Sequence, residues 1–317
     1  MKTILPRKSK TVTLAVLAAL TFSIQAEITA AASAYAGKSA ASMTVNSALG
    51  DADSAKMTAH YEALLKKGRL PEAIAYLSAH IGEVSSYPAM IMVLQLENAV
   101  KKALPSMDQQ FAKTSVQESI NKVYKFGDSF SDVMSRSKDS SLKSLLKEAD
   151  ASGYKLETAE GYFFPVINYA AFQKFRPYVT DDIQAYIDIM TVESNKASVK
   201  DAGLVIGYQE LVNRALTQER FVQQFPNSNR TVQVRSLFDR YKIYTFYGTN
   251  NTPLFDYESK KMQPNAIKGY TALLQYTKNG NSPYLNLLRK FMNLAADNNY
   301  KLTSEVEKYR TINVPVK

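Results

Sequence analysis

Glu193 is the residue of this sequence whose type and position best suit acid or base chemistry. It lies near the end of an amphipathic helix predicted from Thr180, about 70° from the centre of that helix's apolar face. A glutamate at such a boundary can act as a general acid when a cleft raises the pKa of its carboxyl group. A solvated glutamate without a chemical role fits the same position.

The residues that follow Glu193 add a second observation. Ser194, Ser198, Ala202-Gly203 and Gly207-Tyr208-Gln209 come in that order. This order resembles the soluble lytic transglycosylases and goose-type lysozymes, in which a helix ends in Glu-Ser and a Gly-Leu-Met-Gln element follows. The resemblance implies that Glu193 acts as acid/base on the glycosidic bond of peptidoglycan. This chain has a shorter spacing, and Gly-Tyr-Gln stands in place of Gly-Leu-Met-Gln.

An aromatic segment precedes this helix and offers candidate ligand-binding residues. Tyr162, Phe163 and Tyr169 belong to a run of rings that extends to Tyr178. Stacked rings can form a platform for a carbohydrate, but such platforms usually favour Trp, and this chain contains none. Core packing at an interface between two subdomains is therefore the preferred interpretation of these rings.

Several classes of active site are excluded by composition and motif. The chain has no cysteine and only two histidines, so we expect neither a thiolate nor a multi-histidine metal site. No phosphate-binding Gly-rich loop, Ser-His-Asp elbow or zinc-peptidase motif occurs. We therefore expect no cofactor and no bound metal.

The elements that must position these residues are mostly helices. Apolar periodicity predicts an all-α fold, an irregular multi-helix bundle or helical-hairpin layers in two packed subdomains, with at most one small β-hairpin near residues 154–167. A stripe with heptad-like spacing predicts one long helix from Asp108 to about Ser135. We divide the chain into residues 1–36 (a signal peptide), 37–53 (a linker), 54–152 and 153–317 (the N- and C-terminal helical subdomains).

The first predicted helices form a short helical hairpin. Gly68 ends the first helix and Pro71 begins the second. Gly68, Ala73 and Leu77 have the spacing of the Gly, Ala and large apolar positions of a tetratricopeptide repeat, which this hairpin weakly resembles. No 34-residue recurrence follows, so we expect no repeat array.

The N-terminus has the pattern of a secretory signal. Basic residues from Lys2 to Lys10 precede an apolar stretch from Val12 to Ile24, and Ala34-Tyr35-Ala36 fits a cleavage site. We expect cleavage near Ala36, with no membrane span afterwards; a retained N-terminal anchor is the alternative. The location predicted is secreted or cell-wall associated.

The net charge of +10 favours an anionic partner, such as a cell-wall polymer, and an envelope protein is the alternative partner. The basic residues are scattered singly or in pairs, without the interleaved aromatics of a nucleic-acid groove, so no specific nucleic-acid binding is expected.

A final resemblance covers about a third of the chain. It rests on the segments Gly153–Lys155, Ala159–Gly161, Tyr178–Asp181, Val192–Ser194, Lys200–Ala202, Phe225–Pro226, Tyr247–Gly248 and Asn251–Leu254. In these segments the chain is similar to a family of uncharacterised exported proteins of Gram-positive, spore-forming type, whose function is unknown. The resemblance implies export. The leading prediction is a noncatalytic binding or scaffold protein at the cell envelope, with a peptidoglycan-cleaving enzyme and an electrostatic binder of wall polymer as alternatives.

Overall fold

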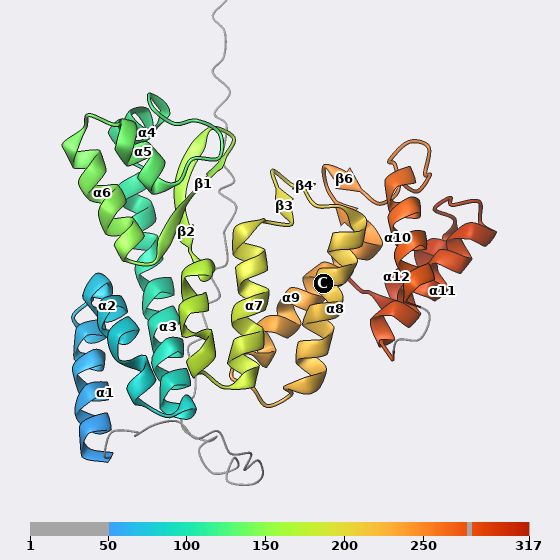
Figure 1. Cartoon of the computed structure of the whole chain (residues 1–317). Helices are drawn as coiled ribbons and strands as arrows, with labels where there is room; N and C mark the ends of the chain where they lie inside the picture. The colour runs from blue at the N-terminus through green and yellow to red at the C-terminus, as the bar shows by residue number, and fades with distance from the viewer. Residues whose placement is uncertain (1–50, 278–280, 317) are drawn as a thin grey trace, which may run out of the picture. The chain divides into compact units, whose positions relative to one another are not determined.

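Helices dominate the structure, a computed structural model that describes residues 51–277 and 281–316 (Figure 1). In chain order the elements are α1 (Asp51–Lys66), α2 (Leu70–His80), η1 (Ile81–Glu83), α3 (Ser86–Phe111), α4 (Thr114–Asn121), α5 (Phe130–Arg136), α6 (Ser140–Ala151), β1 (Tyr154–Ala159), β2 (Tyr162–Ile167), η2 (Tyr169–Tyr178), α7 (Asp181–Asn195), β3 (Val199–Lys200), β4 (Gly203–Leu204), α8 (Tyr208–Gln224), α9 (Thr231–Tyr247), β5 (Gly248–Thr249), β6 (Thr252–Pro253), α10 (Pro264–Tyr276), α11 (Pro283–Asp297) and α12 (Ser304–Asn313). The predicted all-α class is confirmed.

The predicted β-hairpin is present as β1 and β2, which pair antiparallel with Ala159 opposite Tyr162. Its two-residue loop, Glu160-Gly161, has positive φ at both positions (49° and 78°), as a type I′ turn requires. Within the described residues two further antiparallel ladders occur, β3 with β4 and β5 with β6, each two residues long. These two short ladders were not predicted.

The predicted first helical hairpin is also present, as α1 and α2. Gly68 adopts φ +70°, and the Arg69 N–H donates to the Leu64 carbonyl at 3.0 Å. This left-handed glycine satisfies carbonyls at the end of α1 and turns the chain into α2.

The single long helix predicted from Asp108 to Ser135 is wrong. Helix α3 continues to Phe111, and the shorter α4 and α5 follow. Gly127 lies in the connection with φ +87°, which is incompatible with an α-helix. Ser129 and Asp132 then form a capping box that starts α5. The heptad-like spacing therefore reflects apolar residues on separate helices.

The buried apolar residues form two clusters. The first runs from Met57 to Met190 and includes α1 to α7, with Phe221 and Val234 added from later helices. The second runs from Ile206 to Val314. The two clusters divide just after α7, because the β-hairpin, η2 and α7 pack with the N-terminal helices. The division into subdomains at residue 153 stays a prediction.

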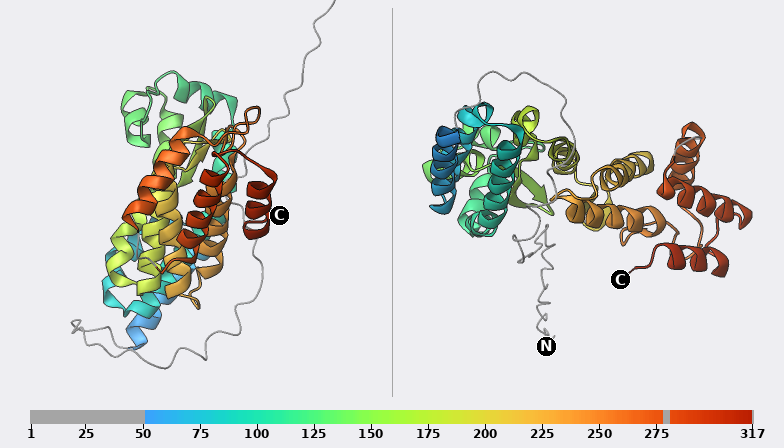
Figure 2. Two further views of the ribbon diagram at one scale, coloured as in Figure 1. Left: turned by 90° about the vertical axis from the view of Figure 1, so that its right-hand side faces the viewer. Right: turned by 90° about the horizontal axis from the view of Figure 1, so that it is seen from below.

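Helices α8 and α9 run side by side after α7, and α10 packs on α8 (Figures 1 and 2). A buried carboxylate joins α8 to α11 at this point. Glu219 of α8 accepts a hydrogen bond from the Tyr284 N–H at 2.8 Å and another from the hydroxyl of Ser282, the residue that caps α11. Glu219 thus satisfies donors at the start of α11, where unpaired N–H groups and the helix dipole favour an anion.

No helix of the described residues combines the length and apolar character needed to cross a membrane. The predicted signal peptide, its cleavage site and most of the linker lie outside the described residues.

Candidate functional site

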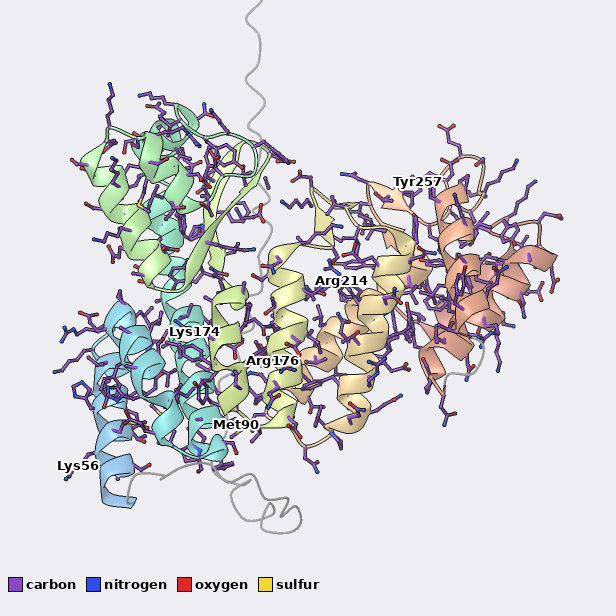
Figure 3. All side chains as sticks on the ribbon, viewed as in Figure 1. Lys56, Met90, Lys174, Arg176, Arg214 and Tyr257 are labelled. Atoms are coloured by element: carbon purple, nitrogen blue, oxygen red, sulfur yellow. The ribbon has the colours of Figure 1, made fainter. Side chains whose placement is uncertain are left out.

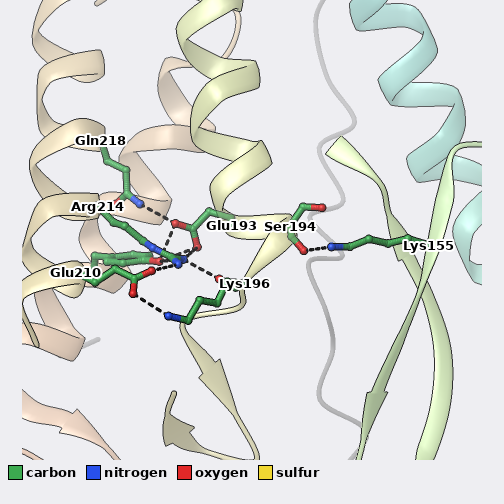
Figure 4. A network of polar contacts seen from close by, with 8 residues as sticks. Lys155, Glu193, Ser194, Lys196, Glu210, Arg214 and Gln218 are labelled. Atoms are coloured by element: carbon green, nitrogen blue, oxygen red, sulfur yellow. Dashed lines mark hydrogen bonds and ion pairs between the residues drawn. The ribbon is translucent and has the colours of Figure 1, made fainter. Parts of the chain in front are cut away.

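The candidate site lies where α7 meets α8 and α9. Glu193 occupies the last turn of α7, and its side chain is 15% exposed. Helix α7 buries Tyr186, Ile187 and Met190 in the first core. Because Glu193 lies beside that apolar face, its carboxylate is directed towards α8 and α9 (Figure 4).

The Glu193 carboxylate accepts hydrogen bonds from both neighbouring helices. The Tyr241 hydroxyl of α9 lies 2.7 Å from each of its two oxygens. From α8, the Gln218 Nε2 lies 3.4 Å from Oε1 and the Arg214 Nη1 lies 3.6 Å from Oε2. One carboxylate therefore ties together three helices (Figure 4).

Arg214 links this carboxylate to a more exposed set of charges. Its side chain is only 6% exposed and reaches from α8 towards α7 (Figure 3). It pairs with Glu210 one turn earlier on α8 and donates to the Lys196 carbonyl at 2.8 Å. The Lys196 ammonium in turn lies 2.9 Å from Glu210. The buried guanidinium is thus shared by two carboxylates and the carbonyl that follows α7.

The surroundings of Glu193 shift the pKa of its carboxyl group upward. Burial raises the pKa of Glu193; the Tyr241 hydrogen bond and the positive charge of Arg214 act in the opposite direction and only partly offset it. Burial likewise raises the pKa of Tyr241, so its hydroxyl remains a neutral donor. The direction of the Glu193 shift is the one that a general acid needs. Its oxygens, however, are already engaged by Tyr241.

Ser194 is directed away from this network. Its hydroxyl donates to the Ile167 carbonyl at 3.0 Å and accepts from the Tyr169 N–H at 3.3 Å. Its carbonyl accepts a hydrogen bond from the Lys155 ammonium (Figure 4). The Glu193-Ser194 pair therefore joins the hairpin and η2 on one side to α8 and α9 on the other.

A further ion pair holds η2 on α7: the Arg176 guanidinium of η2 lies 2.9 Å from the Asp188 carboxylate (Figure 3).

The three candidate ligand-binding aromatics do not share one open surface. Phe163 and Tyr169 are 3% and 5% exposed and belong to the first core. Tyr162 is half-buried and stacks on Phe164 at 6.3 Å between ring centroids. Core packing, the preferred interpretation, describes Phe163 and Tyr169, whose buried rings offer no platform to a sugar.

A second buried carboxylate, Glu97 of α3, was not recognised from the sequence. It is 2% exposed, and the Tyr169 hydroxyl (2.5 Å) and the Tyr186 hydroxyl both donate to its Oε1. The Lys101 ammonium lies 2.7 Å from the same oxygen. The Arg230 guanidinium donates to Oε2 through Nε (3.0 Å) and Nη2 (2.6 Å). Glu97 therefore joins α3, η2, α7 and the start of α9.

The charges around Glu97 decide its ionisation. Burial alone raises the pKa of this carboxyl group, but Arg230 and then Lys101 outweigh it, and the pKa falls to about 2. Burial also raises the pKa of Tyr169 and Tyr186 well above the usual range, so both hydroxyls stay protonated as donors. A charged carboxylate that is surrounded by donors and sealed from solvent can hold helices together but cannot reach a substrate.

The sequence did contain a signal for Glu97. It is the only charged residue between Ala89 and Val100, a stretch whose other residues are mostly apolar and buried. A charge at such a position requires a partner. That partner, Arg230, is 133 residues away in the chain, so the pairing itself could not be predicted.

Within residues 51–277 and 281–316, no group of three or more His, Cys, Asp or Glu residues is arranged to hold a metal ion. Comparisons of the chain with family models, with curated proteins and with solved structures found no match.

Proposed function

We propose that this protein is a noncatalytic binding or scaffold protein that is exported to the cell envelope. The observation that supports the noncatalytic part is the engagement of Glu193, the best candidate for chemistry. Both of its carboxylate oxygens lie 2.7 Å from the Tyr241 hydroxyl, and Arg214 and Gln218 approach from a third helix. A carboxylate that ties three helices contributes to the fold without a reaction.

Export and the envelope location rest on sequence features. These are the signal-like residues 1–36 and the resemblance of residues 153–254 to exported proteins. The net charge of +10 favours an anionic partner, for which a wall polymer is the candidate. Cosedimentation with purified wall polymer at low and at high salt tests this partner. Binding that is lost at high salt supports it, and retention that is independent of salt contradicts it.

A peptidoglycan-cleaving enzyme that uses Glu193 is the second candidate. Two observations favour it: burial raises the pKa of Glu193, and 15% of the side chain remains exposed. For catalysis, the Tyr241 hydroxyl would have to release one carboxylate oxygen so that the protonated carboxyl can reach a glycosidic oxygen.

Zymography on purified cell wall separates the two candidates. The wild-type protein is compared with Glu193→Gln, which keeps the shape of the side chain, and with Glu210→Gln as a matched control. Glu210 pairs with the same Arg214 but is 37% exposed. We expect no clearing by any of the three proteins. Clearing by wild type and by Glu210→Gln, but not by Glu193→Gln, overturns the noncatalytic proposal and establishes the second candidate.

A further inference from the structure

The outer edge of β2 is closed to further strand pairing (Figure 1). The Gln117 side chain of α4 donates to the Phe163 carbonyl at 2.7 Å and accepts a hydrogen bond from the Phe163 N–H at 2.9 Å, as a neighbouring strand would. Further along the strand, Pro165 has no N–H, and the Ile167 carbonyl accepts the Ser194 hydroxyl at 3.0 Å. A side-chain amide, a proline and a helix end therefore protect this edge from another strand.

The contacts of Phe163 also reveal which backbone groups of β1 face outward. In an antiparallel ladder, pairs that exchange hydrogen bonds alternate with pairs whose N–H and C=O groups point away from the partner strand. Phe163 lies opposite Thr158, so Thr158 faces outward, and Leu156, two residues earlier, does the same. The Gly153 carbonyl accepts from the Asn168 N–H at 2.9 Å and faces inward, as the alternation requires.

The outer edge of β1 is open at its centre. In the part of the chain that the structure describes, neither the N–H nor the C=O of Leu156 has a hydrogen-bond partner. The Thr158 N–H is bonded only by the carboxylate of its neighbour Glu157, at 3.0 Å. Residues 156–159 are half-buried, so part of this strand remains open to solvent. Unpaired backbone groups along a strand edge are a template for one more strand.

The charges of β1 favour a second copy of the same strand at this edge. Lys155 and Glu157 flank Leu156 and lie on one face of the hairpin. When two β1 strands pair antiparallel about Leu156, Lys155 of each copy lies opposite Glu157 of the other. The other two centres that outward-facing residues offer, Tyr154 and Thr158, place Glu157 opposite an alanine and match no charges. Only the pairing about Leu156 is complementary in both copies.

We propose that β1 pairs with β1 of a second copy of this chain, so that two hairpins form one four-stranded antiparallel sheet about a two-fold axis. The Leu156 N–H of each copy donates to the Leu156 carbonyl of the other, and Tyr154 pairs with Thr158 on either side. Because the contact is the same on both copies, it closes after two. An extended segment of another protein is the other occupant of such an edge, but the self-complementary charges favour the dimer. The proposal is independent of the function proposed above.

The contacts that Lys155 and Glu157 already make are compatible with this pairing. The Lys155 ammonium donates to the Ser194 carbonyl (Figure 4), and Glu157 lies 2.8 Å from the Lys200 ammonium. An ammonium has three donors and a carboxylate about four acceptor positions. Each side chain can therefore keep its contact within the chain and also take the opposite charge of the second copy.

Sedimentation velocity over a series of protein concentrations tests the pairing. We expect wild type to pass from monomer to dimer as the concentration rises. Leu156→Pro removes the central outward N–H but no bond of the β1–β2 ladder, and it should weaken the dimer about 30-fold through the loss of two hydrogen bonds. Leu156→Ala is the matched control, because it shortens the side chain but keeps the N–H; it should dimerise like wild type.

Charge reversal tests the register separately. Lys155→Glu places like charges opposite each other and should weaken the dimer about tenfold. The double variant Lys155→Glu/Glu157→Lys restores opposite charges and should recover dimerisation, with far-UV circular dichroism to show that each variant is folded. Wild type that stays monomeric at every concentration overturns the proposal. Folded Leu156→Pro that dimerises like wild type, or a folded double variant that does not recover, overturns it as well.

Discussion

Replacing Glu97 by Gln should destabilise the protein more than any other single loss of charge described above. The change leaves Arg230, 12% exposed, and Lys101, 34% exposed, without their shared carboxylate. Removing one partner of a buried ion pair costs about 3–5 kcal/mol. The pKa of Glu97 gives a consistent magnitude: a fall from 4.5 to about 2 corresponds to about 3 kcal/mol of folding free energy.

Urea unfolding followed by circular dichroism measures this loss in the free energy of unfolding directly. In thermal unfolding we expect the midpoint temperature to fall by about 10 °C. Glu72→Gln is the matched control, since Glu72 pairs with Arg69 at 2.8 Å on the surface of α2. The thermal midpoint of Glu72→Gln should equal that of wild type, because an exposed ion pair contributes little to stability. The double variant Glu97→Gln/Arg230→Met should recover part of the loss, because it also removes the unpaired arginine.

The pH dependence provides a second readout. The folded pKa of Glu97 lies below its unfolded value, so its stabilisation is present above about pH 4.5 and is lost as the pH falls towards 2. Wild type and Glu97→Gln should therefore converge in stability at low pH. A difference between them that stays constant from pH 7 to pH 2, or is absent at pH 7, refutes this account of the network.

Two further predictions concern Glu193 and Gly248. Burial raises the pKa of Glu193 in the folded protein, so its contribution to the free energy of unfolding is present at low pH and is lost as the pH rises above about 4.5. Wild type should therefore lose stability relative to Glu193→Gln as the pH rises through that range. A gain of stability relative to Glu193→Gln would contradict the buried environment of this carboxyl group. Gly248→Ala should cost at least about 2 kcal/mol in urea unfolding, because φ is 79° and a Cβ there would lie 2.3 Å from the Thr252 carbonyl oxygen. Gly68→Ala, with φ +70° and no atom within 4 Å, should cost less; equal losses would mean that the close contact has no energetic weight.

Local signals in the sequence predicted much of the fold. Gly68 marked the end of α1, and Gly161 together with the flanking aromatic residues marked the β-hairpin. Both signals act through the backbone conformation of the residue itself, so no distant contact is needed to read them. The prediction of one helix over residues 108–135 failed because apolar periodicity alone does not register that Gly127 adopts a left-handed turn.

The candidate site was predicted only in part, for a different reason. The offset of Glu193 from the apolar face of α7 placed it correctly beside the core, and its exposure of 15% agrees with that position. Its partners Arg214 and Tyr241 are 21 and 48 residues further along the chain, and their approach depends on how α8 and α9 pack. Side-chain pairs of this range follow from tertiary structure, which the spacing of residues does not encode.

Three glutamates, of which Glu97 and Glu219 are buried and Glu193 is 15% exposed, share one structural role. This role explains why the residue best suited to chemistry is already engaged. Glu97 joins α3, η2, α7 and α9; Glu193 joins α7, α8 and α9; Glu219 joins α8 to the start of α11. A carboxylate offers about four acceptor positions, so one side chain can hold several elements in a defined geometry, whereas apolar contacts tolerate sliding. Such groups add little net stability because their desolvation is costly, but each one penalises any other arrangement of its helices. We therefore expect loss of any of these side chains to loosen the register between helices, and loss of Glu97 also to lower the free energy of unfolding.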